Sequence, residues 1–166
     1  MSDTITIRPA SRDDVPLVLE FIRDLARYER LEHEVAASEA QLREALFGER
    51  RYAEVVFACS GGEPVGFALF FHNFSTFKGR PGIYLEDLFV RTEARGRGIG
   101  KQLLAHLARI AVERDCARLE WAVLDWNEPS IGFYRSLGAK PMDEWTTFRL
   151  TGEPLALLAG SADAHG

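Results

Sequence analysis

The chain has 166 residues, of which 46% are hydrophobic and 27% are charged, ordinary values for a soluble globular protein with a real core. A formal net charge of −5 argues against nucleic-acid binding, for which a basic excess is typical. No apolar run approaches membrane-spanning length, and the first residues lack the regions of a signal peptide. We therefore expect a cytoplasmic protein with neither a membrane nor a nucleic-acid partner.

The reactive side chains exclude several chemistries. Cys59 and Cys116 have no metal or redox spacing and fit small core residues in a reducing compartment. The four histidines are scattered, with no partner at metal-ligand spacing. No Gly-x-Ser-x-Gly elbow supports a serine hydrolase. We therefore predict no metal site.

The first part of the sequence predicts helices and a hairpin. Ser11 with Asp14, and Ser38 with Gln41, stand in capping-box positions, which favours a helix start at each serine. Alternating apolar residues and turn signals favour strands elsewhere. In chain order the predicted elements are a strand at 4–8, a helix at 11–28, a helix at 38–47, and strands at 53–58 and 65–71.

The second part predicts a strand–helix–strand unit. Apolar residues from Ile99 to Ala111 recur at three-to-four residue spacing, typical of a helix with one buried face. A right-handed crossover then makes the strands on either side of it parallel neighbours. The predicted elements are a loop at 73–82, a strand at 83–91, the helix from 99, a strand at 117–124, a short helix at 129–137 and a closing strand at 145–150. We expect a single α+β domain over 1–159 and a disordered tail over 160–166.

A glycine-rich turn at 95–101 joins the strand to the helix. Such a turn collects free backbone N–H groups and the positive end of a helix dipole, which together bind phosphate. Glycines let the main chain approach a ligand without obstruction by Cβ, and the arginines and the lysine add cationic charge. The stretch fits neither the P-loop nor the dinucleotide fingerprint.

The pattern Arg-x-x-Gly-x-Gly at 95–100 resembles the pyrophosphate loop of the GNAT superfamily of acyl-CoA-dependent N-acyltransferases. Residues 127–134 with 137–139 resemble its Asn-x-x-x-x-x-Phe-Tyr-x-x-x-Gly segment. Within the superfamily, residues 28–29, 84–87 and 126–130 resemble the diamine (spermidine/spermine) N-acetyltransferases. The resemblance implies the GNAT fold, an α+β (α/β/α) architecture with a mixed sheet of six or seven strands and about four helices.

The resemblance implies acetyl-CoA as co-substrate. Backbone amides of the turn would hold the pyrophosphate, and main-chain groups of the preceding strand would meet the acetyl carbonyl and pantetheine, because family members splay two strands apart there. The residues implied are Leu88, Phe89, Val90, Arg95, Gly96, Arg97, Gly98, Ile99, Gly100, Lys101, Asn127 and Ser130.

The resemblance also implies the catalytic groups. Tyr134 would be the general acid that protonates the departing CoA sulfur, since a phenol with a pKa of about 10 stays protonated at neutral pH. Glu86 would receive the proton of the amine, directly or through water, with Glu29 and Asp87 holding the cation. On a regular strand Glu86 and Asp87 point to opposite faces, so only one is expected to face the cleft. The acceptor-site residues expected are Tyr28, Glu29, Glu86, Asp87, Glu120, Trp121 and Ala122.

Several alternatives stay open at this point. Either strand carboxylate can pair with an arginine for structural reasons, and Tyr134 can be a core tyrosine. The chain can also be a catalytically idle acyl-CoA-binding module, or an acetyltransferase of protein N-termini or lysines. The resemblance further implies a homodimer, for which the aromatic loop at 74–77 is a natural contact.

Overall fold

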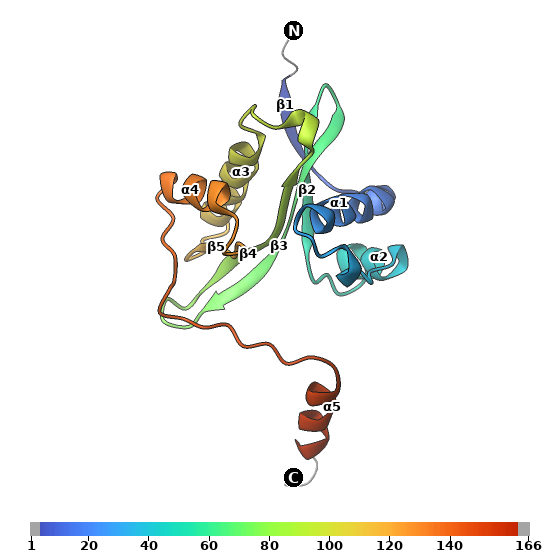
Figure 1. Cartoon of the computed structure of the whole chain (residues 1–166), viewed down its shortest axis with the longest axis vertical. Coiled ribbons are helices and arrows are strands. Elements are labelled where there is room, and N and C mark those ends of the chain that lie inside the picture. The colour runs from blue at the N-terminus through green and yellow to red at the C-terminus, as the bar shows by residue number, and fades with distance from the viewer. Residues whose placement is uncertain (1–3, 163–166) are drawn as a thin grey trace. The chain divides into compact units, whose positions relative to one another are not determined.

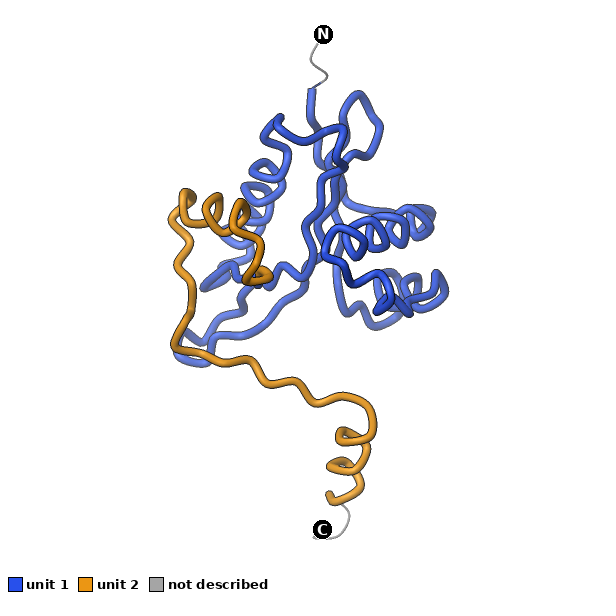
Figure 2. Tube along the Cα trace, viewed as in Figure 1, with its two compact units in different colours: residues 1–122 blue, residues 123–166 orange. Residues whose placement is uncertain are grey.

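The structure is a computed structural model that describes residues 4–162 (Figure 1). The chain forms two compact units, residues 1–122 and residues 123–166 (Figure 2), and each is described by itself. The single domain expected over 1–159 remains a prediction. Residues 163–166 of the expected tail lie outside the described residues.

The first unit is built on a mixed sheet with the strand order β1-β2-β3-β4-β5. Strands β1 to β4 pair antiparallel, whereas β5 is parallel to β4, as the strand–helix–strand unit predicts. The strands are β1 (Ile5–Pro9), β2 (Glu54–Ser60), β3 (Glu63–Ser75), β4 (Arg80–Val90) and β5 (Leu119–Trp121). The sheet therefore has five strands among the described residues, fewer than the six or seven expected.

Helices cover both faces of this sheet (Figure 1). The longer ones are α1 (Val15–Tyr28), α2 (Glu39–Phe47) and α3 (Ile99–Glu113), and the short ones are η1 (Arg12–Asp14), η2 (Glu32–Glu34) and η3 (Thr92–Ala94). Helices α1 and α2 lie on one face and α3 on the other. Phe21 of α1 is buried between Phe57 and Phe67, with ring centroids 5.8 and 5.2 Å away. Stacked and tilted rings at these distances stabilise a core beyond the area they bury.

The predicted helix starts are confirmed. The Ser38 N–H donates to Gln41 Oε1 at 2.9 Å, and the Gln41 N–H donates to Ser38 Oγ at 3.2 Å, a complete capping box. The Ser11 N–H donates to Asp14 at 2.7 Å, so η1 begins there and continues into α1. Arg8 bonds the same carboxylate at 2.8 Å and, as the largest cause, lowers the pKa of Asp14 to about 2.

The predicted loop at 73–82 is wrong, because β3 continues to Ser75 and β4 starts at Arg80. The two ends pair as Ser75↔Arg80 and Asn73↔Gly82, which leaves only residues 76–79 for the turn. Gly82, inside the predicted loop, lies against the Asn73 side chain, where a Cβ would not fit. Close packing between strands, rather than a bend, requires this glycine. Phe77 at the turn is fully exposed, and the homodimer remains a prediction.

The second unit contains α4 (Glu128–Ser136) and α5 (Gly152–Gly160). Helix α4 confirms the predicted short helix, and Gly138 after it has φ = +90°, the left-handed conformation that commonly ends helices. The predicted closing strand at 145–150 is wrong, because none of these residues is in a strand. An apolar alternation becomes a strand only where a neighbour accepts its hydrogen bonds, and no pairing involves this segment among residues 4–162. No helix in that range is long and apolar enough to cross a bilayer.

Candidate active site

Strands β4 and β5 are paired over only part of their predicted length. The register runs from Ile83↔Leu119 to Leu85↔Trp121 and stops there. The strand predicted at 117–124 is thus three residues long. Within the described part of the chain, no strand adds to that edge of β4 from Glu86 to Val90. An edge without a strand neighbour can bind an extended ligand through its main chain.

The glycine-rich turn has the conformation that a phosphate loop needs. Gly96 and Gly98 have φ of +81° and +73°, and no neighbour lies within 4 Å of where a Cβ would stand on either. Gly98 is the N-cap of α3, whose first turn contains no acidic residue. The first N–H groups of a helix have no partner inside it and carry positive partial charge. This turn therefore fits a pyrophosphate on grounds of shape and charge.

The three cationic side chains of the turn have different surroundings. The Arg95 Nε donates to the Val90 carbonyl at 2.9 Å, and its guanidinium lies 4.9 Å from the Tyr28 ring centroid and 5.2 Å from that of Phe89. Arg97 Nη2 donates to Ser60 Oγ at 3.2 Å, and Lys101 is exposed on the first turn of α3. Arg95 therefore connects the turn to the end of α1, a contact that sequence patterns do not reveal.

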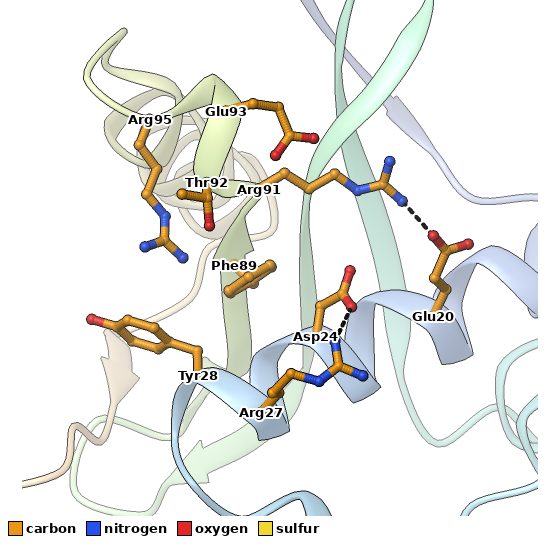
Figure 3. Close-up of a pocket in the computed structure, with 9 residues that line it drawn as sticks. All are labelled: Glu20, Asp24, Arg27, Tyr28, Phe89, Arg91, Thr92, Glu93 and Arg95. Carbon is orange, nitrogen blue, oxygen red and sulfur yellow. Dashed lines mark hydrogen bonds and ion pairs between the residues drawn. The ribbon is translucent and has the colours of Figure 1, made fainter.

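A pocket of about 480 Å³ lies between α1 and the end of β4 (Figure 3). Its charged residues largely pair with one another: Arg91 binds Glu20 at 3.0 Å and Arg27 binds Asp24 at 3.2 Å. Arg91 was not singled out from the sequence, because its pairing with Glu20 of α1 depends on tertiary structure. The lining residues are Glu20, Asp24, Arg27, Tyr28, Phe89, Arg91, Thr92, Glu93 and Arg95.

A bulge in β4 changes how the two strand carboxylates are presented. Asp87 pairs with Leu69 and Leu85 pairs with Phe70, so Glu86 is the extra residue. A bulge interrupts the two-residue alternation of side chains. The regular alternation behind the expectation of opposite faces is therefore interrupted at Glu86, and which carboxylate faces the cleft stays a prediction. Both carboxylates act electrostatically on Glu29 or on each other, Glu86 being exposed and Asp87 half-buried.

Three carboxylates thus meet where α1 ends. Burial and, second, the charge of Glu86 raise the pKa of Glu29. Burial, then Glu86, then Glu29 raise the pKa of Asp87 to about 7. Glu29 is the C-cap of α1, where the helix dipole already disfavours a carboxylate. Each effect opposes negative charge, so a bound cation would relieve all of them together.

The other predicted acceptor residues lie on or beside β5. Glu120 is committed to structural partners, since it pairs with Arg118 at 2.8 Å and accepts from Asn73 Nδ2 at 3.0 Å. Trp121 is half-buried opposite Leu85, and Ala122 is exposed just past the strand. Glu120 is therefore a weaker candidate for holding a substrate than the three carboxylates at the end of α1.

In the second unit, the predicted residues lie on α4 or directly before it. Asn127 is buried and its Oδ1 accepts from the Ser130 N–H at 3.4 Å, so it caps the helix. Tyr134 follows one helical turn after Ser130, is half-buried, and its ring lies 5.7 Å from that of Phe133. The capping contact gives Asn127 a structural role whether or not it also touches a ligand.

No group of three or more histidine, cysteine or acidic side chains suited to a metal occurs between residues 4 and 162.

Comparison with known proteins places these features in a family. The family model described as "Acetyltransferase (GNAT) family" matches residues 18–139. A thialysine N-epsilon-acetyltransferase of Bos taurus is 40% identical over 94% of this chain and 98% of its own length. The L-ornithine N5-acetyltransferase NATA1 of Arabidopsis thaliana is 31% identical over 92% of this chain and 86% of its own.

A solved structure agrees with these matches. An integron cassette protein from the mobile metagenome of V. cholerae superposes with a TM-score of 0.79 and is 33% identical. The match covers 96% of this chain and 98% of that protein. The predicted family and its α+β fold are confirmed, although five strands are described. The chain belongs to the GNAT acetyltransferase family and is an N-acetyltransferase.

Proposed function

We propose that this N-acetyltransferase transfers the acetyl group of acetyl-CoA to a primary amine of a small cationic acceptor, either a polyamine or a lysine-like amino acid. One strand carries the proposal. Among residues 4–162, no strand pairs with one edge of β4 from Glu86 to Val90, and two carboxylates of that stretch, Glu86 and Asp87, interact electrostatically with Glu29. An acyl donor laid along the edge would meet an amine held by the carboxylates.

The acceptor class follows from charge and from the relatives. A cluster of carboxylates raises the local concentration of a cation. Thialysine and ornithine, which the names of two relatives give as acceptors, each carry two amino groups. An acceptor with at least two positive charges suits three carboxylates, one of which can take up a proton while the others stay ionised.

For the donor, we propose that backbone amides of residues 96–101 hold the pyrophosphate and that the main chain of Leu88 and Val90 binds the acetyl carbonyl and pantetheine. The left-handed Gly96 and Gly98 support this assignment, because they leave the approach to the α3 N-terminus open. Asn127 and Ser130 are proposed to contact pantetheine, by resemblance to the family. Arg95 would act mainly by holding the turn in place beside α1, through its contact with the Tyr28 ring.

The chemistry needs two proton movements. The ammonium must lose a proton before its lone pair can attack, and the carboxylates near Glu29 are the proposed route. The departing sulfur must gain a proton, and we propose that Tyr134 gives it, since a phenol is protonated at neutral pH. Aligning donor and acceptor supplies the rest of the rate enhancement by proximity.

The direct test is a panel of amines incubated with acetyl-CoA, with thiol release as the readout. We expect release with polyamines or diamino acids and little with neutral or anionic acceptors. Mass spectrometry of the product then identifies the acetylated nitrogen. Release confined to peptide acceptors would replace the small-amine assignment with one of a protein acetyltransferase.

A substitution at Gly98 tests the phosphate loop. Gly98→Asn keeps a residue type that tolerates the left-handed region but adds a side chain over the α3 N-terminus, so affinity for acetyl-CoA should fall about tenfold or more. Calorimetry measures this loss. The matched control is Gly62→Asn, at a position with φ = +85° and no neighbour within 4 Å of the added Cβ. Equal affinities in the two folded variants would refute the phosphate-loop assignment.

The carboxylate cluster predicts a salt-dependent KM. Added salt screens exposed charges, so KM for a cationic acceptor should rise with ionic strength while kcat changes little. Glu29→Gln should raise KM more than it lowers kcat, which is the mark of lost uniform binding. Glu32→Gln is the control, because Glu32 is exposed and pairs with Arg27 at 3.5 Å. A KM independent of salt in the wild type would contradict cation binding by the cluster.

A further inference from the structure

The bulge in β4 gives Glu86 and Asp87 different environments, although they are adjacent in sequence. Glu86 is the extra residue of the bulge and is exposed to solvent. Asp87 returns to regular pairing opposite Leu69, an apolar residue that packs against the core, and is half-buried. Of the two, Asp87 is therefore the carboxylate whose ionisation depends most on its protein neighbours.

The groups around Asp87 are mostly negative. Glu86 acts on it from β4, and Glu29 acts on it from the end of α1, where the helix dipole adds negative partial charge. From β3 it faces Leu69. A cation near this stretch of β4 is Arg95, whose guanidinium lies over Phe89, two residues further along the strand, and over Tyr28. Asp87 is thus the carboxylate on which the other two act.

We infer that Asp87 is the group that receives the proton from the attacking ammonium, while Glu86 and Glu29 hold the cation beside it. This inference rests on the proposed function. It reverses the assignment that the sequence suggests, in which Glu86 takes the proton. The pKa of about 7 at Asp87 supports the assignment, because a general base works best when its pKa lies near the operating pH.

The proton balance is simple. An N–H bond of the ammonium breaks and its proton goes to an Asp87 carboxylate oxygen, directly or through one water. The freed lone pair attacks the acetyl carbonyl carbon, and the C–S bond breaks as Tyr134 protonates the sulfur. As the amide forms, the nitrogen loses a second proton, which restores the Tyr134 phenol. The reaction as a whole releases one proton, which passes from Asp87 to solvent.

The test compares pH profiles of Asp87→Asn, Glu86→Gln and Glu29→Gln in the full chain with a cationic amine. In the wild type, kcat/KM should rise with pH to a plateau above about pH 7, because the carboxylate form of Asp87 is the active one. Asp87→Asn should lower kcat by about 10²–10⁴-fold and remove this rise. Glu86→Gln and Glu29→Gln should keep the rise but move it to lower pH, since each removes a negative charge that raises the pKa of Asp87.

A second measurement separates a proton acceptor from a residue that only supports the structure. For an amine that carries β-fluorine atoms and is uncharged at pH 7.5, no base is needed, so the kcat deficit of Asp87→Asn should shrink at least tenfold. Asp87→Asn should remain folded, because burial and neighbouring charges already disfavour the ionised aspartate. Its melting curve checks this.

The outcomes are distinct. Loss of kcat in Glu86→Gln, with only a shifted profile in Asp87→Asn, would return the base role to Glu86 and overturn the inference. A deficit in Asp87→Asn that is confined to KM would make Asp87 a cation holder, and a kcat deficit that is equal for the charged and uncharged amines would make it a structural residue. Either result would overturn the inference as well. Wild-type protein that acetylates no amine would instead overturn the proposed function, and this inference with it.

Discussion

Tyr134→Phe should lower kcat by about 10²–10⁴-fold, the contribution typical of an acid–base group. The substitution keeps the ring and its packing against Phe133 and deletes only the hydroxyl that we propose as the proton donor to the sulfur. Affinity for acetyl-CoA should change by less than threefold, because the phosphate loop is untouched. Single-turnover kinetics under saturating acetyl-CoA measure the chemical step directly.

The control for this prediction is Phe133→Leu, which disturbs the same helix without removing a proton donor. It should reduce kcat far less than Tyr134→Phe does. A second check uses an acyl thioester with a more acidic leaving thiol, which needs less protonation, so the defect of Tyr134→Phe should shrink with it. Wild-type kcat in Tyr134→Phe, with chemistry shown to limit the rate, would make this tyrosine structural.

Phe21→Ala should cost about 3–5 kcal/mol of unfolding free energy, the usual range for truncating a buried phenylalanine. Phe21 is completely buried, stacks on Phe67 at 5.2 Å and lies 4.6 Å below the Arg91 guanidinium. Its loss leaves a cavity between α1 and the sheet. Since a typical domain has only about 5–15 kcal/mol of stability, urea denaturation should show a large drop in the midpoint.

The same substitution should affect function indirectly. Helix α1 carries Glu29 at its end, so loosening its packing should raise KM for the acceptor before it changes affinity for acetyl-CoA. Phe77→Ala is the matched control, because that ring is fully exposed and its removal should cost less than about 0.5 kcal/mol. A loss from Phe77→Ala comparable with that from Phe21→Ala would contradict the exposed position and indicate a covering partner.

The amino-acid sequence alone determined the features that depend on local chemistry. Capping serines with their partners at three-residue spacing set the starts of α1 and α2, and apolar periodicity set α3. The glycines at 96, 98 and 100 predicted a phosphate loop because a main chain without Cβ can approach a ligand closely. The motifs around this loop also identified the family, which the comparisons confirmed.

Only the tertiary structure decided the features that depend on a neighbour distant in sequence. Gly82 looks like a turn residue until Asn73 occupies the space beside it, and residues 145–150 look like a strand although no strand pairs with them. The bulge at Glu86 arises from the register of β4 against β3, so no alternation rule could have found it. The difference between Glu86 and Asp87 has the same origin, because burial and charges from other elements, rather than residue type, decide which of two adjacent carboxylates is harder to ionise.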